Sequence, residues 1–230
     1  LFSGSGLTYI LAPKCGYEIL QTTCPEAMYL YGGEDFIKNF SVENDFTYGI
    51  GPGLGTDYET EEKLMHFLKN YNEPLVLDAD ALNLISKNPE NLNLIPKKSI
   101  ITPHPKEFSR LFGESKDSFE RLELAKSKAK ELNIYIVLKG HHTQIITPEG
   151  NVFYNITGNS GLAKGGSGDV LLGIITSFLA QGYSPENAAI FGVWLHGKAA
   201  DFTAEKHSKE AMLASDVIQH IGEVFKYLQK

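Results

Sequence analysis

The chain has 230 residues, of which 42% are hydrophobic and 21% are charged, an ordinary composition for a globular protein. Its formal net charge of −7 and its lack of a basic stripe argue against broad binding to nucleic acid or to an anionic membrane, although a single nucleotide needs only local donors. No run approaches the roughly 18 apolar residues of a membrane span, and no signal peptide is visible. The length fits one domain, which we expect to cover residues 1–230.

The N-terminal region carries both cysteines of the chain. Cys15 and Cys24 are nine residues apart, a spacing that fits no zinc motif, and we interpret them as structural thiols of a protein from a reducing cytoplasm. The chain opens at Leu1 without a methionine, and "LFSGSGLTYILAP" is typical of a helix end, a turn and a strand. We therefore expect a piece of a longer polypeptide.

Strands alternate with helices in the first half of the chain. The apolar segment Leu7–Leu11 predicts a buried strand, a helical or irregular segment follows from Lys14, and residues 31–44 are polar and loop-like. "DFTYGIGPGLG" (residues 45–55) reads as a strand that runs into a glycine turn. After a helix predicted from Glu59 to Tyr71, "PLVLDADALNLI" reads as a buried strand, a turn with two acids and a short helix.

The alternation continues in the second half. "SIITPHPKEFSRLFG" predicts a strand at residues 100–102, a proline-bounded turn and a helix at 105–112. Further helices are expected at residues 118–131, 169–181, 185–203 and from 215 to the end, with a strand at 134–138 and a β-hairpin that turns at 148–150.

This order predicts a mostly parallel sheet with helices on both faces. In such a fold ligands gather at the carboxyl ends of the strands. Five turns follow predicted strands and should share one rim: Gly51–Gly55, Asp78–Asp80, Pro103–Pro105, Lys139–Thr143 and Thr157–Asp169.

The segment "TGNSGLAKGGSGDVLLGIITSFLAQG" places a glycine loop at the start of a helix. Helix N-termini favour anions, and Gly165, Gly166 and Gly168 would let the backbone approach one closely. Asp169 adds a carboxylate, which suggests anion stabilisation and general base catalysis at one point. Alternatively, Asp169 only caps the helix. The loop is neither a P-loop nor a dinucleotide fingerprint.

Five signals occur in one order: "GIGPGLG", "PLVLDADALNLI", "ITPHPKEFSRLFG", "VLKGHHT" and the glycine loop. Together with "APKCGYEILQTTCPEAM", they make the chain resemble the ADP/ATP-dependent NAD(P)H-hydrate dehydratases of the ribokinase-like superfamily over most of residues 1–204. The resemblance implies a three-layer α/β/α fold. It also implies that a nucleotide phosphorylates the ring hydroxyl of the S-epimer of hydrated NADH or NADPH, after which phosphate leaves and the ring double bond returns.

The resemblance assigns roles to residues of this sequence. Asp169 would take the hydroxyl proton, while the loop amides, with Gly166 and Gly168 as catalytic residues, would stabilise the phosphoryl group. Asp169, Gly53, Gly55 and His104 would bind the hydrated dinucleotide. The nucleotide would be bound by Lys139, Gly140, His141, His142, Thr143, Asn159, Gly165 and Gly168. Asp78, Asp80 and Glu107 are weak candidates for holding Mg²⁺.

Plainer interpretations of these residues stay open. The GPGLG segment fits a tight turn, His104 fits a structural histidine, Lys139 fits a solvated surface lysine, and the acids fit a turn held by side-chain hydrogen bonds.

The sequence departs from the family pattern at two places. Lys164 and Ser167 stand where threonine is more usual, and Lys164 would add positive charge near the phosphate. The strand and small-residue loop with which the family normally begins, and which help to bind the substrate, are absent upstream of Leu1. In many bacteria an epimerase domain precedes this domain. The family also tends towards homo-tetramers, and its bacterial members generally use ADP.

Two other functions compete with the dehydratase. A ribokinase-like kinase would use the same acid and glycine loop to phosphorylate a sugar or a vitamin precursor without elimination. A nucleotide-binding regulatory module would bind without turnover, but it would have no use for Asp169 behind a full glycine loop.

Overall fold

The computed structural model of the protein describes residues 1–40, 42–43 and 45–229 and contains two sheets. The strands are β1 (Tyr9–Pro13), β2 (Met28–Gly33), β3 (Gly49–Ile50), β4 (Val76–Leu77), β5 (Ile100–Ile101), β6 (Tyr135–Leu138), β7 (Gln144–Ile146) and β8 (Val152–Tyr154). β1 and β2 pair with each other, and the other six form a sheet in the order β3-β4-β5-β6-β7-β8. β3 to β6 are parallel, whereas β7 and β8 form the predicted antiparallel hairpin.

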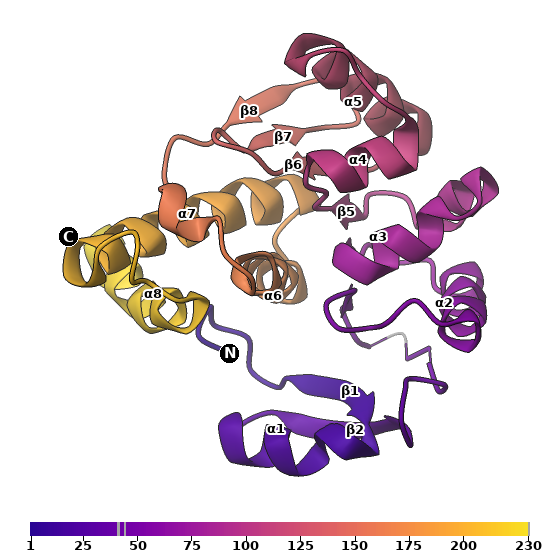
Figure 1. Ribbon diagram of the computed structural model, residues 1–230, viewed down its shortest axis with the longest axis horizontal. Helices are drawn as coiled ribbons and strands as arrows, with labels where there is room; N and C mark the ends of the chain where they lie inside the picture. The colour runs from indigo at the N-terminus through magenta and orange to yellow at the C-terminus, as the bar shows by residue number, and fades with distance from the viewer. Residues whose placement is uncertain (41, 44, 230) are drawn as a thin grey trace.

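Helices cover both faces of the larger sheet (Figure 1). One face carries α2 (Tyr58–Asn70), α3 (Ala79–Ser86), α4 (Pro105–Phe112) and α5 (Ser118–Leu132); the other carries α6 (Ser167–Ala180), α7 (Pro185–His207) and α8 (Ala214–Leu228). Neighbouring strand residues point to opposite faces: Leu77 and Ile101 join the first hydrophobic cluster, and Val76 and Ile100 join the second. The predicted three-layer α/β/α fold is confirmed.

Short helical segments complete the chain: α1 (Tyr17–Thr23), and the 3₁₀ segments η1 (Lys14–Gly16), η2 (Pro89–Leu94) and η3 (Ser160–Leu162). Where the structure describes the chain, no helix combines the length and apolar character needed to cross a membrane.

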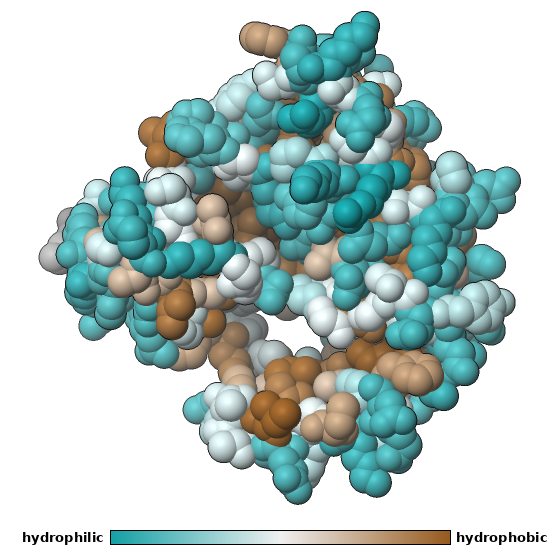
Figure 2. Space-filling view, viewed as in Figure 1, coloured by the Kyte–Doolittle hydropathy of each residue, from teal (hydrophilic) through white to brown (hydrophobic). Residues whose placement is uncertain are grey.

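The N-terminal prediction is wrong in two respects. The first residues form a turn in which the Gly4 N–H donates to the Leu1 carbonyl, and no helix end is present there. The following strand starts at Tyr9 and is not buried, since Tyr9 is exposed and the other strand residues are half-buried; Leu7, the predicted start, is 71% exposed. Within the described part of the chain β1 pairs only with β2, and α1 is short, so this unit buries little apolar surface. Figure 2 shows an opening between it and the rest of the molecule.

The loop predicted for residues 31–44 is also partly wrong, because β2 continues to Gly33. Ser41 and Asn44 of that loop, and Lys230 at the end of the predicted last helix, lie outside the described residues.

A buried histidine makes the fold sensitive to acid. His196 of α7 is 6% exposed, and its Nε2 has no hydrogen-bond partner among the described residues. Burial, assisted by the charge of Lys139, lowers the pKa of His196 to about 4. In the unfolded chain its pKa is near 6.5, so the unfolded state takes up the proton first as pH falls. The neutral form of His196 therefore contributes fully to the stability of the folded state above about pH 6.5, and this contribution is lost as the pH falls towards 4.

Because of His196, we expect the free energy of unfolding to fall by about 2 kcal/mol between pH 7 and pH 5. Urea unfolding at the two values measures the cost, and His196→Leu, which cannot titrate, is the matched control. The wild type should lose about 2 kcal/mol more than the variant. Equal losses in the two proteins would contradict the assignment.

Candidate active site at the carboxyl ends of the strands

Four of the five turns predicted to share a rim contact one another directly. The backbone N–H of Gly55 donates to Oδ2 of Asp80 at 3.0 Å, which ties the GPGLG turn to the start of α3. The N–H of Lys139 donates to the carbonyl of Pro103 at 3.0 Å, and its Nζ donates to Oδ1 of Asp78 at 2.7 Å. The turns after β3, β4, β5 and β6 therefore lie together.

The glycine loop brings the fifth turn to the same rim. Gly166 caps the start of α6 with φ +87° and ψ −20°, a left-handed conformation that favours glycine. Gly168 lies close to this ion pair: a Cβ there would be 3.3 Å from Oδ2 of Asp78 and 3.4 Å from Nζ of Lys139, a tight fit. The first turn of α6 thus packs against the Lys139–Asp78 pair.

Asp169 is an exposed acid in this first turn. It does not cap α6, because the N-cap residue is Gly166 and no side chain supplies a cap hydrogen bond. Among the described residues, no hydrogen bond or ion pair engages the Asp169 carboxylate. The capping interpretation therefore has no support in the geometry, and the carboxylate is free to meet a ligand.

Lys164 does not place its charge towards this site as expected. Its Nζ donates to the carbonyl oxygens of Glu210 and Met212, the latter at 2.9 Å. The lysine therefore ties the glycine loop to the segment before α8. Ser167, the other departure, is buried at the start of α6.

Beneath the loop, Lys139 lies between two buried acids. Its Nζ is 2.7 and 3.0 Å from the two oxygens of Asp78 and 3.8 Å from Oε2 of Glu107. Asp78 is 1% and Glu107 5% exposed. Burial raises the pKa of the Asp78 carboxyl above its usual value, although the ion pair with Lys139 opposes this. Lys139 is consequently held in place and is not a solvated surface lysine.

His104 builds the start of α4. Its Nδ1 accepts the N–H groups of Lys106 and Glu107 at 3.1 and 3.2 Å, and the Glu107 carboxylate accepts the N–H of His104 in return at 2.8 Å. These bonds form a capping box. Because Nδ1 accepts, the neutral ring carries its proton on Nε2. The His104 ring is partly exposed, and its contact with the hydrated dinucleotide stays a prediction.

The three candidate magnesium ligands do not fit a dedicated metal site in this arrangement. Asp78 binds Lys139, Glu107 closes the α4 capping box, and Asp80 holds Gly55. Over residues 1–40, 42–43 and 45–229, no three His, Cys, Asp or Glu side chains come together as metal ligands. The acids instead hold the turns of the rim.

The remaining predicted nucleotide ligands follow β6. Gly140, His141 and His142 are exposed beside Lys139, and the two imidazole rings lie edge to face with centroids 4.4 Å apart. The Thr143 carbonyl accepts the N–H of Asn155, which anchors the end of the turn to the residue that follows β8. Their exposure leaves them accessible to a ligand at the rim.

Comparison with known proteins identifies the family. The family model described as NAD(P)H-hydrate dehydratase (Carb_kinase) matches residues 1–223. The chain belongs to the NAD(P)H-hydrate dehydratase family. The ADP-dependent (S)-NAD(P)H-hydrate dehydratase of Bacillus subtilis is 34% identical to it over 230 residues, which cover 97% of this chain and 80% of that protein.

A solved structure agrees with this assignment to the dehydratase family. The ADP/ATP-dependent NAD(P)H-hydrate dehydratase of Bacillus subtilis, co-crystallised with ATP and Mg²⁺, matches with a TM-score of 0.83 and 33% identity, over 98% of this chain and 80% of that one. Some members of the dehydratase family are much longer. The bifunctional NAD(P)H-hydrate repair enzyme Nnr of Thermofilum pendens is 33% identical over 96% of this chain, but the chain spans only 42% of its length.

The sequence analysis missed Asp201, which holds the predicted nucleotide ligand Asn159 in place. Its Nδ2 donates to the Ala200 carbonyl and, at 3.0 Å, to Asp201, while its Oδ1 accepts the N–H of Gly161. Asp201 also accepts the N–H of Gly158. Asp201 on α7 therefore fixes the start of the glycine loop, and no motif around it signals this. Asn159 and Asp201 both line a cavity of about 520 Å³.

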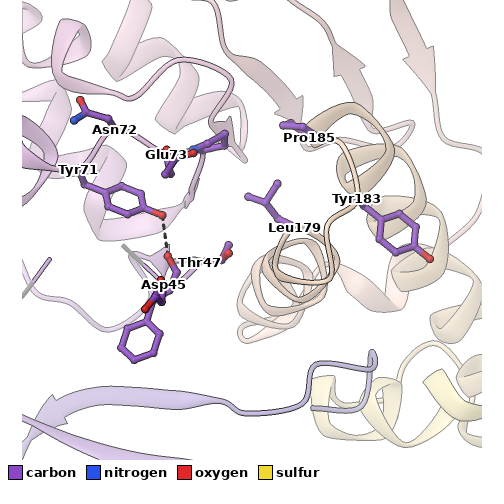
Figure 3. Close-up of a pocket in the computed structure, with 10 residues that line it drawn as sticks. Asp45, Thr47, Tyr71, Asn72, Glu73, Leu179, Tyr183 and Pro185 are labelled. Carbon is purple, nitrogen blue, oxygen red and sulfur yellow. Dashed lines mark hydrogen bonds between the residues drawn. The ribbon is translucent and has the colours of Figure 1, made fainter. Parts of the chain in front are cut away.

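A second cavity, of about 630 Å³, lies at the opposite end of α6 from the glycine loop (Figure 3). It lies between the segment before β3, which includes Asp45 and Thr47, and Leu179 and Pro185 near the α6–α7 turn. Tyr71 borders it and donates to the Phe46 carbonyl at 2.9 Å. None of the predicted residues of the dehydratase site lines this cavity, so its size does not make it the candidate site.

Proposed function

We propose that this chain catalyses the nucleotide-dependent dehydration of the S-epimer of hydrated NADH or NADPH, which regenerates the reduced cofactor. The observation that carries the proposal is the unpartnered Asp169 carboxylate in the first turn of α6, next to Gly168 and above the fixed Lys139 ammonium. An acid, a helix N-terminus and a cation at one point are the groups that phosphoryl transfer to a hydroxyl requires.

The reaction divides into two steps. In the first, the ring hydroxyl attacks the terminal phosphorus of the nucleotide, Asp169 takes the hydroxyl proton, and the bond from that phosphorus to the nucleotide breaks. The N–H groups of the Gly165–Gly168 loop and the Lys139 ammonium stabilise the charge on the moving phosphoryl group. In the second, the C–O bond breaks, phosphate leaves with the bonding electrons, and the neighbouring ring carbon loses a proton to restore the double bond.

The substrates are assigned to opposite sides of Asp169. The adenine nucleotide would lie along Lys139–Thr143 and Gly165–Gly168, with Asn159 behind the loop. The hydrated dinucleotide would lie along Gly53 and Gly55, with His104 at the neighbouring turn. The Asp80–Gly55 bond gives the substrate turn a fixed position relative to α3.

The relatives support further proposals about the whole protein. ADP-dependence in one relative and crystals with ATP and Mg²⁺ in another suggest ADP or ATP as donor with Mg²⁺ bound to its phosphates. A cytoplasmic homo-oligomer, most simply a tetramer, without nucleic-acid or membrane partners, is proposed from the family resemblance and the charge of −7.

Phosphorus NMR of the products separates this function from a small-molecule kinase. With hydrated NADH and ATP, the dehydratase should accumulate ADP and free orthophosphate in equal amounts. A kinase that is offered a sugar or vitamin-precursor alcohol together with ATP would instead accumulate the phosphate ester of that alcohol, and that product would overturn the proposal.

A further inference from the structure

Lys139 places a fixed cation beside Asp78 and Glu107, two of the three candidate magnesium ligands. Its Nζ lies 2.7 and 3.0 Å from the two oxygens of Asp78 and 3.8 Å from Oε2 of Glu107. Both acids are almost fully buried. A buried carboxylate needs a compensating positive charge, and the ammonium supplies it for Asp78, its nearer partner.

Other groups also engage the two acids. Oδ1 of Asp78 accepts the N–H of Ala79 at 2.9 Å, and Oε2 of Glu107 accepts the N–H of His104 at 2.8 Å. Oε1 of Glu107 lies 3.4 Å from Nε2 of His104. A magnesium ion demands near-octahedral oxygen ligands at about 2.1 Å and keeps several waters. These oxygens offer no such shell while Lys139 stays between them.

The ammonium also lies against the reacting end of the candidate site. A Cβ at Gly168 would be 3.4 Å from Nζ of Lys139, and Gly168 directly precedes Asp169. The glycine at this position therefore allows the first turn of α6 to pack on the ammonium. Lys139 adds its charge to the positive end of the helix dipole, where an anion would bind.

We propose that Lys139 is the resident cation of this site, held there by Asp78 and Glu107 as positioning residues, and that a divalent ion enters only on the phosphates of the nucleotide. This inference rests on the proposed function for the identity of the nucleotide.

Mn²⁺, a paramagnetic substitute for Mg²⁺, tests the proposal in the full chain without any turnover. Electron paramagnetic resonance reports the free ion. Without nucleotide, the wild type should leave the Mn²⁺ signal of the buffer unchanged; with ADP, the signal should fall as the complex binds. A wild type that binds about one Mn²⁺ per chain without nucleotide, and loses it in Asp78→Asn, would overturn the proposal.

Calorimetric titration with ADP tests the positioning role. Lys139→Met should weaken ADP binding by about tenfold, the loss expected for one charge-assisted hydrogen bond. Asp78→Asn should change ADP affinity in the wild-type background but not in the Lys139→Met background, since it acts through the lysine. Lys206→Met, which breaks an exposed lysine–acid pair with Glu223 elsewhere, is the matched control and should bind ADP normally.

The results distinguish this inference from the proposed function. Equal effects of Asp78→Asn in both backgrounds would reduce Asp78 to a structural residue and overturn the inference alone. A chain that shows the expected Mn²⁺ and ADP behaviour, but regenerates no NADH from its hydrate, would overturn the proposed function and leave Lys139 as the resident cation.

Discussion

Asp169→Asn should lower the turnover of hydrated NADH by about a thousandfold while ADP still binds. The acid is assigned to the proton of the attacking hydroxyl, and positioned general bases contribute rate factors of about 10² to 10⁴. Asparagine has the same shape and cannot take the proton. Because Asp169 is exposed and caps no helix, its replacement should leave the free energy of unfolding within about 0.5 kcal/mol of the wild type.

Steady-state rates, ADP titration and urea unfolding of the variant measure the three parts of this expectation. Glu186→Gln is the matched control, because Glu186 lies in the first turn of α7, distant from the rim. It should leave all three quantities near their wild-type values. If Asp169→Asn retained a tenth or more of the turnover, Asp169 would not be the general base.

Gly51→Ala should destabilise the protein by about 3 kcal/mol or more. Gly51 begins the GPGLG turn with φ +146°, and a Cβ there would overlap the carbonyl oxygen of Asp78. The methyl group would push β3 away from the turn after β4, which carries the acid that holds Lys139. We expect both the stability of the fold and the geometry of the candidate site to be disturbed.

Gly53→Ala provides the control within the same turn. Gly53 has φ +66°, but a Cβ there would meet no atom within 4 Å. Gly53→Ala should lower the free energy of unfolding by about 1 to 2 kcal/mol, the value for an alanine in the left-handed conformation without a steric clash. Denaturant unfolding of both variants measures the difference. Equal costs would show that the turn relaxes away from Asp78, which would contradict the close packing of the two turns.

Periodicity and turn chemistry predicted most of the larger sheet and its helices, because buried parallel strands and capped helices leave local signals. The strand β2 was missed, since a half-exposed strand such as Met28–Gly33 lacks a clear apolar pattern. The exposure of β1 could not be predicted either, because burial depends on which elements pack against a strand.

The candidate site was predicted as a set of turns but not as a set of contacts. The glycine loop and the acids are visible as motifs, yet their partners lie far apart in the sequence. Asp78 and Lys139 are separated by 61 residues, and Asn159 and Asp201 by 42. Local patterns cannot show such pairings, so Asp78 was only a weak candidate for a metal ligand or a turn residue, and Asp201 was overlooked.

The most direct test of the proposed repair activity mixes the full chain with the S-epimer of hydrated NADH and either ADP or ATP. Restored near-ultraviolet absorbance of reduced nicotinamide, with one orthophosphate released per NADH formed, is the predicted result. Unchanged absorbance in the presence of either nucleotide, from a folded protein that binds ADP, would contradict the proposed function.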